Sequence, residues 1–260
     1  MKKKADGWKI AAECAKIGDK IVNTFIAVVI ITALLYGGFG LWDTYQIYAN
    51  AGVDKDILKY KPTLSEDGEN PTLSELQAIN PDVCAWLTID NTNIDYPVVC
   101  GENNLEYVNK AVDGSFSLSG SVFLDSRNEK DFSDFYSLLY AHHMAGEAMF
   151  GVLPDFQEKN FFDTHPTGIL FTLEKTYEIE IFACIHTDAY DNVMFNPTSH
   201  QRNGEKKKLL KYIRKSSKQY KDLDISINDQ IIGLSTCYDA TTSGRILVFG
   251  KLTERRTEGK

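Results

Sequence analysis

Apolar residues form one long uninterrupted block near the start of the chain and alternate with polar residues over much of the rest. The block contains no charged residue between Ile21 and Trp42. A helix needs about 20 apolar residues to cross the hydrocarbon core of a bilayer. The pattern therefore predicts one membrane-spanning helix over residues 21–42.

A cleaved secretory signal is the competing interpretation of this block. Ala49, Asn50 and Ala51 have the small-x-small form of a cleavage site. The apolar core of a signal peptide is usually only about 7–15 residues long, and the cleavage site follows it closely. The block here is longer and the tripeptide lies well beyond it, so a retained span is favoured.

The charges that flank the predicted span indicate its orientation. Residues 1–20 contain six lysines, whereas Asp43, Asp54 and Asp56 follow the span. Basic residues remain preferentially on the cytoplasmic side of a membrane. We therefore expect residues 1–20 to be a cytoplasmic tail and the chain after Trp42 to lie outside the cell.

Two further segments follow the span. Apolar residues recur at helix-like intervals from Asp43 to about Tyr60, and prolines interrupt the stretch from Lys61 to Thr72. We assign residues 43–73 to a juxtamembrane helical region with a connector. Residues 74–260 form one larger domain, the candidate catalytic domain.

The pattern of this last domain is mainly that of β-strands. A turn-rich quartet, residues 90–93, separates two strand-like runs and predicts a hairpin. One amphipathic helix is predicted over residues 201–220. Strands are expected at 83–89, 94–99, 120–125, 136–141, 168–173, 177–186, 231–237 and 245–252. About eight strands with few helices fit a closed, mainly antiparallel barrel with peripheral helices.

Charge and cysteine content restrict the classes of partner. The chain carries −8 overall and residues 1–20 carry +3, so the remainder carries −11, which argues against nucleic acid as a partner. There is no Cys-x-x-Cys pair among the five cysteines. The four beyond the span could in principle form two disulfides, but Cys84 and Cys184 lie in apolar runs, where a buried thiol is expected.

Cys237 and Arg245 are the candidates for chemistry. The thiol ends one apolar strand and the guanidinium begins the next, so both are expected at one rim of a sheet. A cysteine nucleophile acts as a thiolate and needs a partner for its proton, usually histidine.

Five histidines are available for this role. His165 and His200 adjoin or follow prolines in polar loops and are expected to be solvated surface residues, and His186 continues a strand. His142 and His143 end an apolar strand. Because successive strand residues face opposite sides, only one of the two can face Cys237, and spacing does not say which.

The order of several motifs resembles that of the sortases, specifically the class B sortases of the Gram-positive cell surface. The resemblance covers about residues 74–252. Its motifs are residues 80–90 and 92–99, Asn104 with Tyr107-Val108, Asp113-Gly114, residues 120–125 with Arg127-Asn128, Tyr140 to Met144, and Leu234 to Cys237 followed by Arg245.

The resemblance implies roles for individual residues. Cys237 matches the nucleophile, Arg245 the essential arginine and His142, the first of the pair, the catalytic histidine. Ala141 replaces the glycine that usually precedes that histidine. Asn104, Tyr140 and Ser235 match positions that line the peptide groove of the family. Cys100 stands where a polar residue is expected, and the pattern gives no reason for it.

The resemblance also implies a reaction. A membrane-anchored cysteine transpeptidase would cleave a C-terminal sorting motif of secreted proteins after threonine, through a thioester, and transfer them to a peptidoglycan amine. No metal or organic cofactor is implied. One alternative is a pilin-polymerising sortase that uses a lysine amine. The other is a non-catalytic, membrane-anchored binding module in which Cys237 is merely a buried thiol.

Overall fold

The computed structural model describes residues 2–49, 55–64, 70–237 and 243–255, without the side chains at 2–7, 9–11, 46–49, 55 and 237. The chain divides into two compact units, residues 1–46 and 47–260. The end of the predicted juxtamembrane region belongs to the second unit, where Ile57 and Tyr60 pack against its buried residues.

Helix α1 runs from Lys2 to Ala49 without interruption. Its segment Ala12–Tyr45 is, among the described residues, the one helix long and apolar enough to cross a membrane. Large apolar side chains along it, such as Phe25, Leu34 and Phe39, are more than half exposed. An apolar surface of this kind fits a helix whose solvent is lipid.

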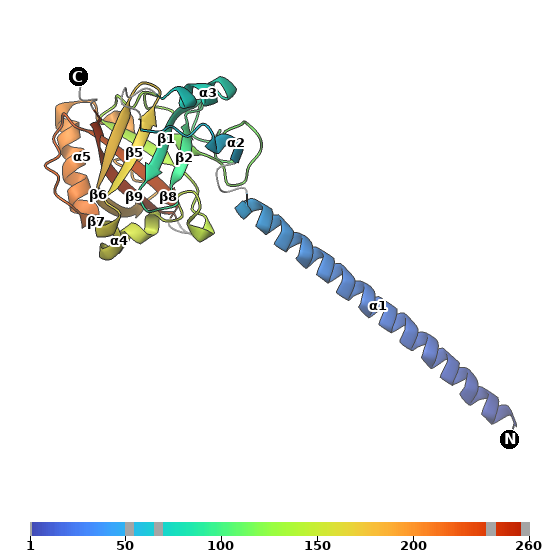
Figure 1. Ribbon diagram of the computed structural model, residues 1–260. Helices are drawn as coiled ribbons and strands as arrows, with labels where there is room; N and C mark the ends of the chain where they lie inside the picture. Colours follow the sequence, from blue (N-terminus) through green and yellow to red (C-terminus); the bar gives the residue numbers. More distant parts are fainter. Residues whose placement is uncertain (1, 50–54, 65–69, 238–242, 256–260) are drawn as a thin grey trace. The chain divides into compact units, whose positions relative to one another are not determined.

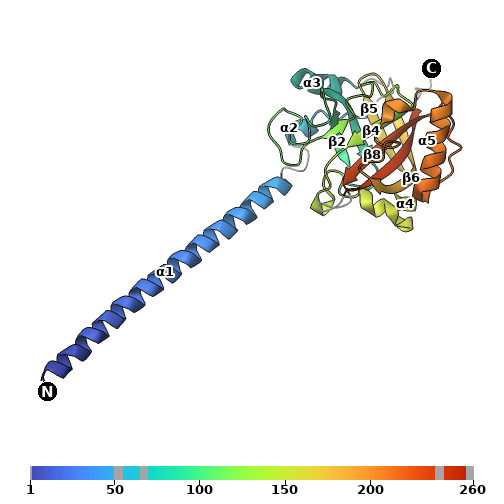
Figure 2. The same ribbon diagram turned by 180° about the vertical axis from the view of Figure 1, so that it is seen from behind.

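The second unit is a closed eight-stranded barrel, as the strand pattern predicts (Figures 1 and 2). Its strands are β1 (Val83–Ile89), β2 (Asp95–Val99), β3 (Val122–Leu124), β4 (Tyr136–Tyr140), β5 (Thr167–Thr172), β6 (Thr176–Asp188), β8 (Gln230–Cys237) and β9 (Gly244–Glu254). They follow one another in the order β5-β1-β2-β3-β4-β8-β9-β6, and the pairing of β5 with β6 closes the barrel. Neighbours are antiparallel except for β2–β3 and β4–β8.

Short helices surround the barrel. They are α2 (Lys55–Leu58), α3 (Pro71–Ile79), α4 (Lys159–Thr164) and α5 (Asn203–Ser216), with single 3₁₀ turns at Ala145–Glu147, Leu153–Gln157 and Pro197–Ser199. α5 buries Leu209 and Ile213 in a cluster with Phe182 and Phe249 on the outside of the barrel. The apolar face of this amphipathic helix is therefore fully used in packing.

The predicted helix 201–220 is wrong at its C-terminal end. α5 stops at Ser216, and Ser217–Tyr220 forms strand β7, which pairs with β6. The ring of Tyr220 meets that of Phe182 edge-on, with centroids 6.2 Å apart. The free edge of β6 thus overrides the local helical pattern, because pairing and burial outweigh propensity.

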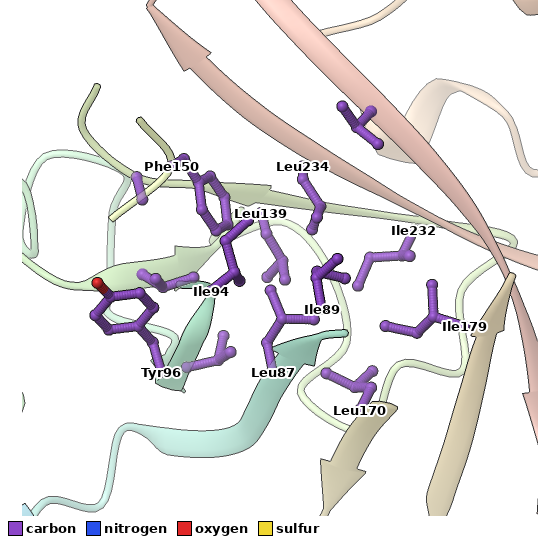
Figure 3. Close-up of a cluster of buried hydrophobic side chains, with 14 of the residues drawn as sticks. Leu87, Ile89, Ile94, Tyr96, Leu139, Phe150, Leu170, Ile179, Ile232 and Leu234 are labelled. Carbon is purple, nitrogen blue, oxygen red and sulfur yellow. The ribbon is translucent and has the colours of Figure 1, made fainter. Parts of the chain in front are cut away.

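Inward-facing residues fill the barrel with aliphatic and aromatic side chains. Figure 3 shows this cluster, to which β1, β2, β4, β5, β6 and β8 all contribute. Tyr96 joins it through its ring, and its hydroxyl accepts a hydrogen bond from the Met149 backbone at 3.0 Å.

The expected burial of Cys84 and Cys184 is confirmed, and the same core explains Cys100. All three are free thiols and at most 3% exposed. Burial raises the pKa of Cys84 and, to about 12, that of Cys184. Cys100 faces the barrel interior beside them, where a polar side chain would be costly to bury.

Candidate active site

Three neighbouring strands, β4, β8 and β9, bring the predicted site residues to one rim of the barrel. Tyr140 is in register with Ser235, and Cys237 with Arg245. Beyond the end of β4, the Ala141 amide donates to the Ser235 carbonyl at 3.2 Å, and the Thr236 hydroxyl donates to the Ala141 carbonyl at 2.9 Å. The chain after Ala141 therefore leaves the sheet at the level where β8 ends.

Cys237 is the last residue of β8, and its backbone position opposite Arg245 is described. Its side chain, and residues 238–242 after it, lie outside the described part of the chain. The geometry of the site is therefore built from the groups that surround this position.

His142 and His143 differ in what they contact. The ring of His142 is half-buried, and its Nε2 lies 2.8 Å from the carbonyl oxygen of Val108. A carbonyl only accepts, so Nε2 carries the proton and Nδ1 of the neutral ring has the free lone pair. His143 is exposed and pairs through its backbone with Met149.

His142 is also two residues beyond Tyr140, whose partner Ser235 is two residues before Cys237. Residues two apart along an extended chain share a face. This alternation strictly applies only as far as Tyr140, where β4 ends. The preference for His142 over His143 stays a prediction, supported by the half-buried ring of His142 against Val108.

The other three histidines contact the protein elsewhere. His165 stacks on Phe161 with ring centroids 3.7 Å apart, and His186 is exposed on β6. The expectation that His200 is solvated is wrong. It is 7% exposed, and its ring bonds to the Val193 carbonyl at 2.8 Å, because the chain folds back over Tyr136 at this point.

Arg245 opens β9 with its side chain half-buried. Its Nη1 donates to the carbonyls of Gly244 and Ser243 at 3.0 and 3.3 Å. Among the described residues no carboxylate forms an ion pair with it, although its charge contributes weakly to the lowered pKa of Asp188, which the Ser243 hydroxyl lowers most. Within the described part of the chain, no other hydrogen bond of the guanidinium is found.

Two of the predicted groove residues converge on a buried carboxylate that the sequence analysis gave no role. The Tyr140 hydroxyl and the Asn104 amide each donate to Asp125 Oδ2 at 3.0 Å. Arg127 donates to both carboxylate oxygens, through Nε at 2.8 Å and Nη2 at 2.6 Å. Asp125 is completely buried, and these four bonds satisfy it.

Asp125 therefore acts as a hub that fixes the walls around the rim. Burial alone would raise its pKa, but the hydrogen bonds and charge of Arg127 hold that pKa below its usual value. Arg127 also donates to the Phe195 carbonyl at 2.8 Å, and Phe195 stacks against Tyr140. The only sequence signal for this hub was the motif containing Asp125 and Arg127.

Ser235, the third predicted groove residue, lies beneath the surface. It is 1% exposed, and its hydroxyl has no hydrogen-bond partner among the described residues. A substrate could reach it only after a movement of its neighbours.

Replacement of Asp125 by asparagine is expected to lower the free energy of unfolding by about 2 kcal/mol, because its buried carboxylate accepts charge-assisted hydrogen bonds from Arg127 that a neutral amide cannot replace in full. The effect should be complete at pH 7 and disappear as the pH falls below about 4. There the wild-type carboxylate, whose folded pKa is below that of the unfolded chain, also becomes protonated. Urea unfolding of the full-length protein in detergent micelles measures it.

Asp163→Asn is the matched control for this prediction. Asp163 also pairs with a cation, Lys159 at 2.8 Å, but both side chains are more than half exposed. Its replacement should change stability by less than about 1 kcal/mol. Equal effects of the two variants would show that Asp125 is not a hub.

Comparison with known proteins connects this barrel and rim to a family. No family model matches the chain. The chain is similar to Sortase B of Staphylococcus aureus, with 27% identity over 235 residues that cover 88% of this chain and 96% of that protein. A solved class B sortase of Streptococcus pyogenes, described as involved in pilus biogenesis, is 51% identical. The match covers 69% of this chain and 97% of that one, with a TM-score of 0.65.

The chain belongs to the class B sortases. A third relative, the S. aureus sortase B–substrate complex, is 27% identical and covers 74% of this chain and 88% of that chain, with a TM-score of 0.68. This class B sortase is thus a sortase cysteine transpeptidase, and the non-catalytic binding module is not supported.

Proposed function

We propose that Cys237, His142 and Arg245 carry out the transpeptidation. The observation that supports this assignment most directly is the register. Position 237 lies opposite Arg245 on β9, and β4, which leads into His142, runs parallel to β8 and in register with it. This register supports a site in which a nucleophile, a proton carrier and a fixed cation act together at one rim.

In this mechanism the Cys237 thiol passes its proton to Nδ1 of His142, and the resulting thiolate attacks the carbonyl carbon of the threonine in a sorting motif. The carbon–nitrogen bond of the next peptide breaks, and His142 gives its proton to the departing amine. The incoming amine then attacks the thioester, loses a proton to His142 and releases the thiolate. Arg245 donates hydrogen bonds to the oxyanion in both steps. No step calls on a metal or an organic cofactor.

The bond from His142 to Val108 supports proton transfer at Nδ1. Val108 holds the Nε2 proton, so only Nδ1 has a lone pair that can exchange a proton with the thiol or the amine. Asp125 supports this geometry indirectly, since Asn104, which it holds, lies in the same connection between β2 and β3 as Val108.

His142→Ala and His143→Ala form a matched pair that tests this role. The first is expected to lower kcat for peptide cleavage by about 10²–10⁴-fold, because general acid–base catalysis is lost. The second should change kcat by less than about twofold, because its side chain is exposed. The opposite order would transfer the role to His143.

We further propose that α1 anchors the enzyme in the membrane with its N-terminus in the cytoplasm and the barrel outside. The lysines before residue 21 and the aspartates after Trp42 support this orientation. Secreted substrates emerge at the same surface, so the anchor would raise the effective concentration of enzyme and substrate.

The acceptor amine has two candidates. The sequence analysis favours a peptidoglycan amine, with secreted sorting-motif proteins as the first substrate. The identity of 51% with a sortase described as involved in pilus biogenesis instead supports the alternative, a lysine amine of a pilin subunit. We favour the pilin, because the relatives described simply as sortase B are only 26–32% identical.

Mass spectrometry of the product linkage distinguishes the two acceptors. The full-length enzyme would first be given five-residue peptides with threonine at the fourth position, to find a motif that it cleaves. It would then receive that motif with a lysine-containing pilin peptide and a wall peptide ending in a free amine, in competition. We expect the isopeptide bond on the pilin lysine. Exclusive transfer to the wall peptide would contradict the pilin proposal and support anchoring of proteins to the cell wall.

A further inference from the structure

The segment Arg202–Lys221 concentrates positive charge in an otherwise acidic domain. It contains nine lysine and arginine residues and one acid, Glu205, for a net charge of +8. Residues 21–260 carry −11 in total, so the rest of them sums to −19. The domain is therefore acidic overall but has one strongly basic segment.

Helix α5 places this charge on one side. At about 100° per residue, five side chains fall within an arc of roughly 120° that points away from the buried Leu209 and Ile213. All five are exposed. We call them the cationic arc: Lys207, Lys208, Lys211, Arg214 and Lys215. The helix covers one flank of the barrel (Figures 1 and 2).

The protein itself does little to neutralise the arc. Arg214 pairs with Asp222 at 3.2 Å, but among the described residues the four lysines form no ion pair. Lys207, Lys211 and Lys215 succeed one another at intervals of four residues, where like charges destabilise a helix. The helix dipole favours Arg214 and Lys215 in the last turn, but gives no such support to Lys207, Lys208 and Lys211. A row of like charges that lowers local stability is typical of a functional surface.

We propose that the cationic arc binds a linear polyol-phosphate polymer of the cell surface. Lysine ammonium groups are flexible point charges that contact phosphates without requiring a fixed geometry. The row Lys207–Lys211–Lys215 presents one charge every four residues, about 6 Å along the helix. A polymer with regularly spaced phosphodiesters can lie along this row and contact each lysine in turn.

The composition of the arc disfavours the other anionic partners. A helix that lies in a membrane surface inserts an apolar face, but the apolar face of α5 is packed on the barrel. A docked protein buries apolar and aromatic side chains at the centre of its interface. The arc has neither, and offers charge alone.

The polymer would hold the catalytic domain at its surface without entering the reaction. The apolar cluster beneath α5 also supports Tyr140 and Phe195 of the catalytic rim. The arc itself points to solvent, and none of its residues belongs to the proposed catalytic set. Binding and peptide cleavage are therefore expected to be separable.

The test measures binding of synthetic poly(glycerol phosphate) of defined length to the full-length protein in detergent micelles. One variant replaces Lys207, Lys211 and Lys215 by glutamine. A control of equal charge replaces Lys59, Lys159 and Lys175, which lie elsewhere on the domain. At 0.1 M salt, the arc variant should bind at least tenfold more weakly than the wild type. The slope of log affinity against log salt should fall by about two, as expected for three lost phosphate contacts.

The control variant should bind like the wild type, and both variants should cleave peptides normally. Absence of wild-type binding, or equal weakening by both triple variants, would overturn the proposal. The proposal would also be overturned if the arc bound another anion more tightly than poly(glycerol phosphate). Tighter binding to phosphatidylglycerol vesicles would favour a membrane, and tighter binding to polyglutamate would favour an acidic protein. The test measures polymer binding and not transpeptidation, so its result does not depend on whether the acceptor amine is the pilin lysine.

Discussion

Replacement of Cys237 by alanine is expected to abolish both thioester formation and product, with turnover lowered by more than about 10³-fold. No other described thiol of the barrel can replace it, because Cys84, Cys100 and Cys184 are buried and burial raises the pKa of each. Single-turnover assays with a sorting peptide, followed by mass spectrometry of the intact enzyme, measure both quantities.

Cys14→Ala is the matched control, since Cys14 is the one described thiol that is exposed. A thiol-reactive substrate mimic should label the Cys14→Ala enzyme at Cys237, whereas the Cys237→Ala enzyme should turn over no substrate. Normal turnover by Cys237→Ala would exclude the thioester mechanism.

Replacement of Arg245 by lysine is expected to lower kcat by about 10²–10³-fold, the usual cost of removing an oxyanion donor. Two backbone carbonyls accept hydrogen bonds from Nη1 of the guanidinium, and in the proposed role its other N–H groups bind the oxyanion. Lysine retains the charge, but a single ammonium cannot make both sets of bonds. Steady-state kinetics of peptide cleavage separate the fall in kcat from any change in KM.

Arg202→Lys makes the same exchange at an exposed helix terminus and should leave kcat unchanged. Both variants should unfold like the wild type, since neither arginine forms an ion pair among the described residues. Near-normal turnover by Arg245→Lys would contradict the oxyanion role.

The main elements were predictable because their signals are local. The uncharged block and the alternation along Tyr177, Ile179 and Ile181 each reflect a single environment, an apolar solvent for the first and a half-buried strand for the second. The eight-stranded barrel followed from the number of such strands. The candidate site residues followed from residue type and motif order.

The errors of prediction arose where distant segments meet. The helix predicted to Tyr220 ends at Ser216, because β6 offers an edge that the sequence pattern does not display. His200 is buried although its neighbours are polar. Asp125 looked like the end of a short strand, and its role appears only when Asn104, Arg127 and Tyr140 surround it.

By itself, the sequence determined that this protein has an apolar N-terminal helix and a β-rich domain with a thiol, an imidazole and a guanidinium at strand ends. Periodicity and residue chemistry act over a few residues and can be read directly. Only the tertiary structure decided that the ring of His142 is half-buried against Val108 while His143 is exposed, and which carboxylate organises the rim. These outcomes depend on segments that lie far apart in the sequence, such as β4 and β8, whose paired residues Tyr140 and Ser235 are 95 positions apart. A contact at that separation leaves no periodic trace in the chain, because it is fixed by the closure of the barrel.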